Sequence, residues 1–144
     1  MSAKKIRWLS LLLFAAALLA LPALAAGNTY ETASLQERED LIYRFLTEEL
    51  GLDRPAACGV LGNMYCESSL DPTASCVDVN GKISYGLCQW NGGRYQALQD
   101  YCAPRGLDYR SAEGQLAFLR YELENSEKGA LAAIRALGDN AEGA

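Results

Sequence analysis

A single interruption of the helical hydrophobic period limits what this chain can fold into. Apolar residues recur at helical spacing up to residue 70, alternate between residues 77 and 85, and recur at helical spacing again from residue 94. Asn80-Gly81 splits the alternating stretch and is the preferred pair for a two-residue type I′ turn, which predicts a small β-hairpin. The pattern therefore predicts an α+β, mostly helical domain with a cleft beside the hairpin.

Two helices are expected before the hairpin. Ser34 and Glu37 have the spacing of a capping box, and the helix that they begin should end at Gly51. Asp53 can cap a second helix, which should end near Leu70 because Asp-Pro follows.

Three more helices are expected after the hairpin, over residues 94–102, from a cap at Ser111, and over residues 127–137 with Gly138 as the stop. The apolar stripes of the first four helices predict the core. Its expected members are Leu41, Ile42, Phe45, Leu46, Leu50, Ala57, Val60, Leu61, Met64, Tyr65, Ala97, Leu98, Tyr101, Leu116, Leu119 and Leu123.

Residues 1–26 have the pattern of a secretory signal peptide. A basic start with Lys4, Lys5 and Arg7 precedes an apolar stretch and the small-residue cleavage signal Ala23-Leu-Ala25. A retained membrane anchor is the alternative, but Pro22 leaves fewer than the roughly 20 apolar residues that a spanning helix needs. We therefore expect a secreted or cell-wall-associated bacterial protein, with no stable membrane insertion after cleavage.

The charge of the mature chain restricts its partners. The leader contains three of the 13 basic residues and none of the 18 acidic ones, so ten basic residues remain and the net charge is −8. Binding to nucleic acid depends on Lys and Arg patches, so nucleic acid is excluded as a partner. We expect a monomer whose residues 27–33 form a flexible lead and whose residues 34–144 form the folded domain.

The chain contains no histidine, which removes Ser-His and Cys-His nucleophile pairs and His-ligated zinc sites. No metal or cofactor is expected, and the chemistry should depend on carboxylates. The five cysteines form no Cys-x-x-Cys pair, so one or two disulfides are expected in an exported protein, with at least one thiol left over. They are Cys58, Cys66, Cys76, Cys88 and Cys102.

Glu67 is the strongest candidate for a catalytic group. It lies in the last turn of the second predicted helix, where partial burial and the negative end of the helix dipole would both favour the protonated carboxyl. A protonated carboxyl can act as a general acid toward a glycosidic oxygen. Asn63 lies one turn earlier on the same face, and Gly59 and Gly62 suggest close packing of this helix, which would exclude water near Glu67.

The second candidate element is Ser84–Trp90, where the alternation ends. Tyr85 and Trp90 could stack on sugar faces and Gln89 could bind sugar hydroxyl or acetamido groups, although a core role for both aromatic residues is equally open.

Three segments in order, Gly59–Pro72, Ser84–Arg94 and Gly114–Leu123, resemble the phage tail lysozyme family of peptidoglycan hydrolases. The resemblance covers roughly residues 38–137. It implies a lysozyme-like fold, with Glu67 as the catalytic acid and with Gly86, Leu87 and Gln89 lining the sugar cleft. The chain departs from the family pattern by having a leader and by ending before a further aromatic-rich segment, so we expect a catalytic domain truncated at its C-terminus.

The resemblance further implies cleavage of the β-1,4 bond between N-acetylmuramic acid and N-acetylglucosamine in glycan strands of peptidoglycan. Asp71 and Asp78 are candidates for a second carboxylate that positions water, although both could be plain surface residues. Without a second carboxylate, the substrate's own acetamido or 6-hydroxyl group could complete the reaction, and the sequence does not separate a hydrolase from a lytic transglycosylase. Tyr121 is a further candidate for the cleft, with helix packing as its alternative role.

Two other functions remain open at this level. The chain could be a catalytically idle lysozyme-like module that binds glycan or protein. It could also be a small binding protein held together by disulfides, which the few cysteines and regular helical stripes argue against.

Overall fold

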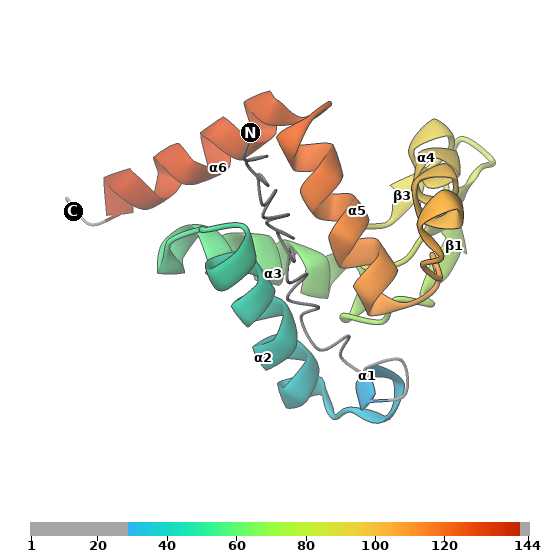
Figure 1. Cartoon of the computed structure of the whole chain (residues 1–144), viewed down its shortest axis with the longest axis horizontal. Helices are drawn as coiled ribbons and strands as arrows, with labels where there is room; N and C mark the ends of the chain where they lie inside the picture. The colour runs from blue at the N-terminus through green and yellow to red at the C-terminus, as the bar shows by residue number, and fades with distance from the viewer. Residues whose placement is uncertain (1–28, 142–144) are drawn as a thin grey trace, which may run out of the picture.

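The computed structural model describes residues 29–141 and confirms the mostly helical α+β fold (Figure 1). The predicted leader lies outside these residues, and within them no helix is long and apolar enough to cross a membrane. In chain order the elements are α1 (Thr29–Thr32), α2 (Leu35–Arg44), the π-helix η1 (Phe45–Glu49), α3 (Arg54–Ser68), β1 (Ser75–Val77), β2 (Ile83–Tyr85), β3 (Trp90–Asn91), α4 (Gly93–Cys102), the 3-10 helix η2 (Ala103–Arg105), α5 (Ala112–Glu124) and α6 (Lys128–Ala141).

The predicted caps begin α2 and α3. The Ser34 side chain accepts a hydrogen bond from the Glu37 N–H at 3.3 Å, and the Asp53 carboxylate accepts one from Ala56 N–H at 2.9 Å. The expected flexible lead is wrong, because residues 29–32 form α1. The Tyr30 ring is buried there and its hydroxyl donates to the Leu70 carbonyl oxygen at 2.8 Å.

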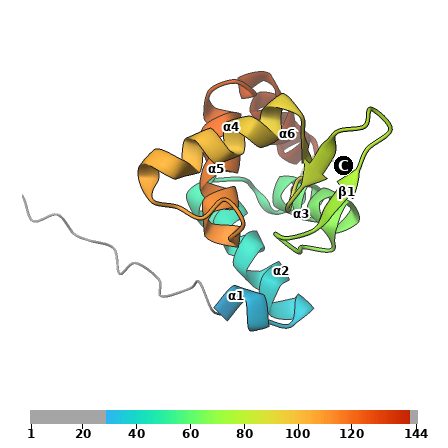
Figure 2. The ribbon, with the colours of Figure 1, turned by 90° about the vertical axis from the view of Figure 1, so that its right-hand side faces the viewer.

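The hairpin is present, but its turn differs from the predicted type I′. Val77 lies opposite Ile83, the Asp78 N–H donates to Lys82 O at 2.9 Å, and the Gly81 N–H donates to Asp78 O at 2.8 Å. With Gly81 at φ 74°, this is a three-residue loop that ends in a glycine bulge. The sheet order is β1-β2-β3 with antiparallel pairing, and β3 was not predicted because two residues carry no periodic signal. Figure 2 shows the hairpin extending from one side of the helices.

The later helices follow the sequence pattern except at one end. Ser111 caps α5, and α4 packs antiparallel to α5, as contacts at both ends of the pair show. The predicted stop at Gly138 is wrong, since α6 continues to Ala141. Glycine ends a helix when it adopts a left-handed conformation, as Gly106 does after η2 with φ 66°.

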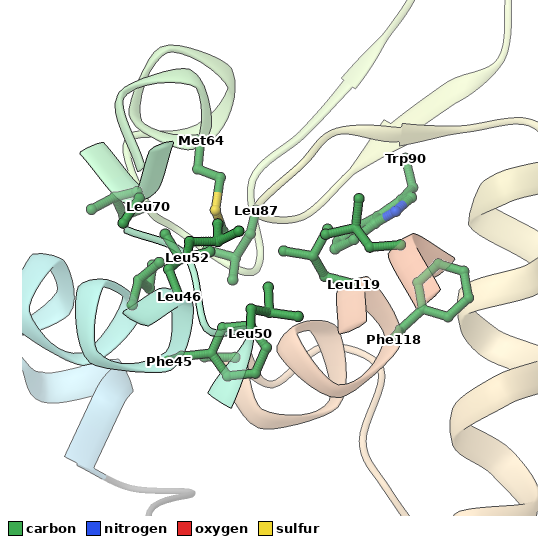
Figure 3. Close-up of a cluster of buried hydrophobic side chains, with 14 of the residues drawn as sticks. Phe45, Leu46, Leu50, Leu52, Met64, Leu70, Leu87, Trp90, Phe118 and Leu119 are labelled. Carbon is green, nitrogen blue, oxygen red and sulfur yellow. The ribbon is translucent and has the colours of Figure 1, made fainter. Parts of the chain in front are cut away.

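The core lies where α2, η1, α3, the 86–90 turn and α5 meet (Figure 3). Most of the predicted inward residues are buried or partly buried, but Tyr65 is 46% exposed and Ala97 is exposed. The expected close packing at Gly59 and Gly62 is also wrong, because a Cβ on either would meet no atom within 4 Å. The largest fully buried side chains are Trp90, Ile42, Leu46, Met64, Leu70, Leu87, Leu98, Gln115 and Cys102.

The expected disulfides are absent, since all five cysteines are free thiols in the structure. Cys58 and Cys66 both lie on α3, eight residues apart. That spacing is about 12 Å along a helix axis, whereas a disulfide needs Cα atoms within roughly 7 Å. Cys102 is buried between α4 and α5, where its thiol approaches the Gly114 carbonyl oxygen at 3.7 Å.

Candidate active site

Glu67 lies in the last turn of α3, where the helix ends in a left-handed residue. Ser69 has φ 52° and its N–H donates to the Tyr65 carbonyl oxygen at 2.8 Å. The expected partial burial of Glu67 is wrong, because its side chain is exposed. Within residues 29–141 no hydrogen bond or ion pair is recorded for its carboxylate, which therefore faces solvent and is accessible to a ligand.

The helix face that leads to Glu67 carries small and polar residues. Gly59, Asn63 and Glu67 follow one another at four-residue spacing and are all exposed. The glycine has open space around it, so a ligand can approach the backbone of α3 on this face. The exposed glycines, which were predicted to be packing positions, instead keep this face open.

Strained backbone conformations occur just after α3 and at the end of the Gly86–Gln89 segment. The non-glycine residues with positive φ in the described part of the chain are Ser69 (52°), Leu70 (59°) and Gln89 (45°). Leu70 is fully buried, so its packing against the core compensates for the strained conformation. Strained residues of this kind often gather at active sites, where the surrounding structure holds them in place.

Ser68, which was not among the predicted site residues, joins the end of α3 to the turn after β2. Its buried hydroxyl lies 3.1 Å from the carbonyl oxygens of both Met64 and Leu87, and it can donate to either. The residue beside Glu67 is thereby tied to the Gly86–Gln89 segment. The two segments that the sequence predicted as site elements are therefore in contact in the structure.

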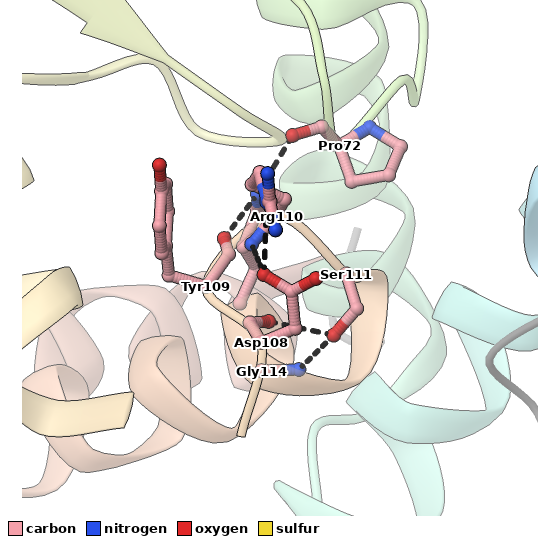
Figure 4. Close-up of polar contacts among 7 residues, drawn as sticks. Pro72, Asp108, Tyr109, Arg110, Ser111 and Gly114 are labelled. Carbon is pink, nitrogen blue, oxygen red and sulfur yellow. Dashed lines mark hydrogen bonds and ion pairs between the residues drawn. The ribbon is translucent and has the colours of Figure 1, made fainter. Parts of the chain in front are cut away.

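Gln115 fixes the same turn from the other side and was also missed. Its fully buried carboxamide accepts from the Leu87 N–H at 2.8 Å and donates to the carbonyl oxygens of Pro72 at 2.7 Å and Tyr109 at 2.9 Å. Figure 4 shows the carbonyl groups of Pro72 and Tyr109 close together beside the start of α5. The signal in the sequence was a glutamine on the inward stripe of a helix, where an apolar residue is usual.

Gly86 and Gln89 belong to the turn that Ser68 and Gln115 hold in place. Gly86 has φ 76° and lies directly against the Gln115 carboxamide. The Gln89 amide donates to the carbonyl oxygens of Gly86 at 2.9 Å and Ala74 at 3.1 Å, and its oxygen lies 3.4 Å from the Cys76 sulfur. The residue is only partly buried, so part of it is open to solvent.

Tyr85 belongs to an aromatic cluster next to this turn. Its ring stacks on Tyr95 with centroids 5.1 Å apart and is tilted against Tyr109 at 5.8 Å. Burial raises the pKa of Tyr85, with Tyr95 and Tyr109 adding to the shift and Arg110 opposing it, so its hydroxyl is neutral and can donate a hydrogen bond. The ring is partly exposed and can contact a ligand.

Trp90 does not line a sugar site, which corrects the substrate-binding role predicted for it. It is fully buried, its ring packs edge-on against Phe118 at 5.6 Å, and its indole N–H donates to Glu122 at 3.0 Å. A ring without exposed surface has no face to offer a sugar. The core role, which the sequence had left open, is the one that Trp90 has.

Glu122 is buried and forms an ion pair that also was not predicted. Arg94 from α4 donates to both carboxylate oxygens at 2.7 Å. Burial works to raise the pKa of Glu122, but the hydrogen bonds from Arg94 and Trp90 outweigh it, so the pKa lies below its usual value. Glu122 is therefore a carboxylate that links α4, α5 and β3, and it is not a proton donor.

Cys88 is a partly buried residue of the Gly86–Gln89 segment. Burial raises the pKa of its thiol to about 12, the Glu122 and Glu67 carboxylates add to the shift, and Arg94 opposes it. The thiol is therefore protonated at neutral pH and is a poor nucleophile. Because Glu67 contributes to the shift, its carboxylate lies within electrostatic range of Cys88.

The two candidates for a second carboxylate are both engaged in local turns. Asp71 accepts from the N–H of Thr73 at 2.8 Å and from its hydroxyl at 2.7 Å. Asp78 accepts from the Val79 N–H at 2.6 Å and from the Ser84 hydroxyl at 3.3 Å, which places it in the hairpin loop. Each carboxylate keeps lone pairs that could bind a water molecule.

Tyr121 lies on α5 in another group of side chains. Its ring packs against Tyr101 at 4.8 Å and Phe118 at 6.4 Å, and Arg105 lies 5.9 Å from its centroid. Nothing in these contacts joins Tyr121 to the turn that carries Gln89. In the described residues, no group of three or more Cys, Asp or Glu side chains could hold a metal ion.

A family model described as phage tail lysozyme matches residues 37–144, which is more than half of the chain. The match includes α3 with Glu67, the hairpin with the Gly86–Gln89 turn, and α5 with Gln115.

Proposed function

Because the chain belongs to the phage tail lysozyme family, we propose that it is an exported muramidase in which Glu67 is the general acid. Membership of this family makes the protein a lysozyme-like peptidoglycan hydrolase, an enzyme of the glycosidase type. The proposal adds the bond, the acid and the compartment. The bond is the β-1,4 linkage between N-acetylmuramic acid and N-acetylglucosamine.

The observation that carries the proposal is the place of Glu67 at the exposed end of α3, next to Ser68, which is bonded to the Gly86–Gln89 turn. A glycan bound there covers the Glu67 side chain and removes water from it. Glu67 then donates its proton to the leaving oxygen while positive charge develops on the sugar ring.

The proposed substrate contacts are those that the structure leaves accessible. Asn63 precedes Glu67 on the exposed face of α3, and the Gln89 side chain and the Tyr85 ring are partly exposed. Gly86 is buried against Gln115, which corrects the substrate contact predicted for it: it shapes the turn and does not touch the sugar. Amide groups bind sugar hydroxyl and acetamido groups, and an aromatic face stacks on a sugar ring.

Asp71 is the better candidate for a second carboxylate, because it follows the strained end of α3 closely, whereas Asp78 lies in the hairpin loop. In an inverting mechanism it positions the attacking water. In a reaction without a second carboxylate, the substrate's own acetamido or 6-hydroxyl group takes this part, and the product then identifies the mechanism.

Export is proposed from the leader pattern in residues 1–26. It places the enzyme, as a monomer, outside the cytoplasm and next to its polymer. Mass spectrometry of the protein purified from culture medium or periplasm tests this, since cleavage after Ala25 or Ala26 gives a defined mature mass.

Digestion of purified peptidoglycan tests the catalytic proposal. Muropeptides released by the wild type and by Glu67→Gln are compared by mass spectrometry, with Glu48→Gln as a control at an exposed glutamate of η1. We expect the Glu67 variant to fold normally and to lose activity by about 10²–10⁴-fold, while the control keeps it.

The products decide between the mechanisms. Reducing ends indicate a hydrolase, and 1,6-anhydro ends indicate a transglycosylase. A folded wild-type protein that binds peptidoglycan without releasing muropeptides would contradict the proposal and favour the glycan-binding module.

A further inference from the structure

A second concave site lies between α4, η2 and the outer side of α5. It has a volume of about 300 Å³ and is lined by Ala97, Asp100, Tyr101, Arg105, Phe118 and Tyr121. This volume is at the small end of the range for ligand sites and suits an amino acid or a short peptide. Glu67 and the Gly86–Gln89 turn do not line it.

Two opposite charges line this site without pairing with each other. The Arg105 guanidinium lies 3.9 Å from the centroid of the Tyr101 ring and donates to the Tyr101 carbonyl oxygen at 2.8 Å. Asp100 instead accepts from Gln96 at 3.0 Å. Among the described residues no ion pair is recorded for either group, although oppositely charged neighbours that can meet on a surface often do.

The partners of the two charges hold them in place for a ligand. The ring and carbonyl group of Tyr101 orient the Arg105 guanidinium, which leaves N–H groups for a carboxylate. The Asp100 carboxylate has free lone pairs for an ammonium group.

An exposed aromatic residue completes the site. Tyr121 is 44% exposed, yet its ring is fixed against Tyr101 at 4.8 Å. An immobilised ring provides apolar contact at a low cost in side-chain entropy. A ligand that meets all three features has a carboxylate, an ammonium group and an aliphatic part between them.

We propose that this pocket binds a zwitterionic peptide, with the ligand carboxylate on Arg105, its ammonium group on Asp100 and its aliphatic chain on Tyr121. If the chain is the peptidoglycan hydrolase proposed above, on which this step rests, the ligand is the stem peptide of that polymer. The stem peptide carries free carboxylates and a diamino-acid amine. A neutral glycan would leave both charges of the pocket unused.

Titration with the tripeptide L-alanyl-γ-D-glutamyl-L-lysine tests the pocket. Binding is followed by two-dimensional NMR on the purified protein carrying Glu67→Gln, so that catalysis plays no part. The expected dissociation constant is in the millimolar range, with shifts at Tyr121 and Tyr101. Arg105→Gln should weaken binding by about threefold to fivefold, and Arg120→Gln, the adjacent arginine of α5 that is bonded to Glu124, should not change it.

Acetylation of the lysine amine tests the proposed contact with Asp100. The acetylated peptide should bind the parent protein about threefold to fivefold more weakly. Asp100→Asn should weaken binding of the free amine by the same factor and leave binding of the acetylated peptide unchanged, because each change removes the same contact.

Three results would overturn the proposal: equal binding to the parent protein and to both pocket variants, additive effects of acetylation and Asp100→Asn, or shifts at Tyr121 with chitotetraose but not with the tripeptide. A protein that binds the tripeptide but whose wild type releases no muropeptides contradicts the muramidase proposal and not the pocket. A protein that digests peptidoglycan without binding the tripeptide contradicts the pocket alone.

Discussion

Gly86 shows how a single residue sets the geometry of the proposed site. An added Cβ would lie 2.5 to 2.7 Å from three atoms of the Gln115 carboxamide, and the backbone has φ 76°. Gly81 in the hairpin loop has nearly the same conformation, φ 74°, but nothing lies within 4 Å of an added Cβ. The two glycines therefore separate the effect of conformation from that of contact.

We expect Gly86→Ala to destabilise the protein more than Gly81→Ala does. Both variants lose about 1–2 kcal/mol because alanine disfavours the left-handed conformation. Gly86→Ala also displaces Gln115 and leaves buried polar groups unpaired, at about 1–3 kcal/mol more. Urea unfolding of the two variants measures this difference, and equal losses would show that Gln115 moves without breaking its hydrogen bonds.

At the scale of elements, the Arg94–Glu122 pair links α4 to α5. The pKa of Glu122 lies below its unfolded value, so the pair stabilises the folded state above the unfolded pKa of about 4.3. This contribution is lost as the pH falls through the folded pKa. The side chain of Arg94 is 54% exposed, so solvent weakens the pair relative to one that is wholly buried.

Glu122→Gln should therefore destabilise the protein by about 1–3 kcal/mol at pH 7, and by less at pH 3. Glu124→Gln, which breaks an exposed pair with Arg120 on the same helix, should cost less than about 1 kcal/mol. Urea unfolding at both pH values checks this. An equal effect of Glu122→Gln at pH 3 and pH 7 would mean that its charge contributes nothing.

For the molecule as a whole, stability comes from the apolar core and not from disulfides. The five cysteines are free thiols, and the core continues from α2 through α3 and the 86–90 turn to α5. A domain of this size can bury about two-thirds of its unfolded surface. A scaffold held together by disulfides is therefore not needed to explain the fold.

A reducing agent should leave the melting temperature of the protein unchanged to within about 2 °C. A chain with one native disulfide would lose roughly 2–5 kcal/mol on reduction and melt several degrees lower. Thermal unfolding followed by circular dichroism, with and without reductant, makes the comparison, and a thiol titration of the denatured protein should find all five cysteines reactive. A clear drop in melting temperature would show that an oxidised pair stabilises the fold.

The sequence predicted what local chemistry controls. Ser34, Asp53 and Ser111 begin their helices as expected, because a cap needs only a side chain and the backbone beside it. It missed the glycine bulge after Asn80, the continuation of α6 past Gly138 and the short strand β3. Each of these depends on how a segment pairs or packs, and a short pattern leaves that open.

By itself the sequence determined the helix–hairpin–helix order, the family, and the place of Glu67 at the end of a helix. Periodicity, caps and motif spacing are local properties, because each depends only on residues that lie close together in the chain. Only the tertiary structure decided that Trp90 belongs to the core, that Glu67 is exposed, and that Gln115 and Ser68 hold the turn beside it. Burial and long-range hydrogen bonds join residues far apart in the chain, so they exist only once the helices have packed.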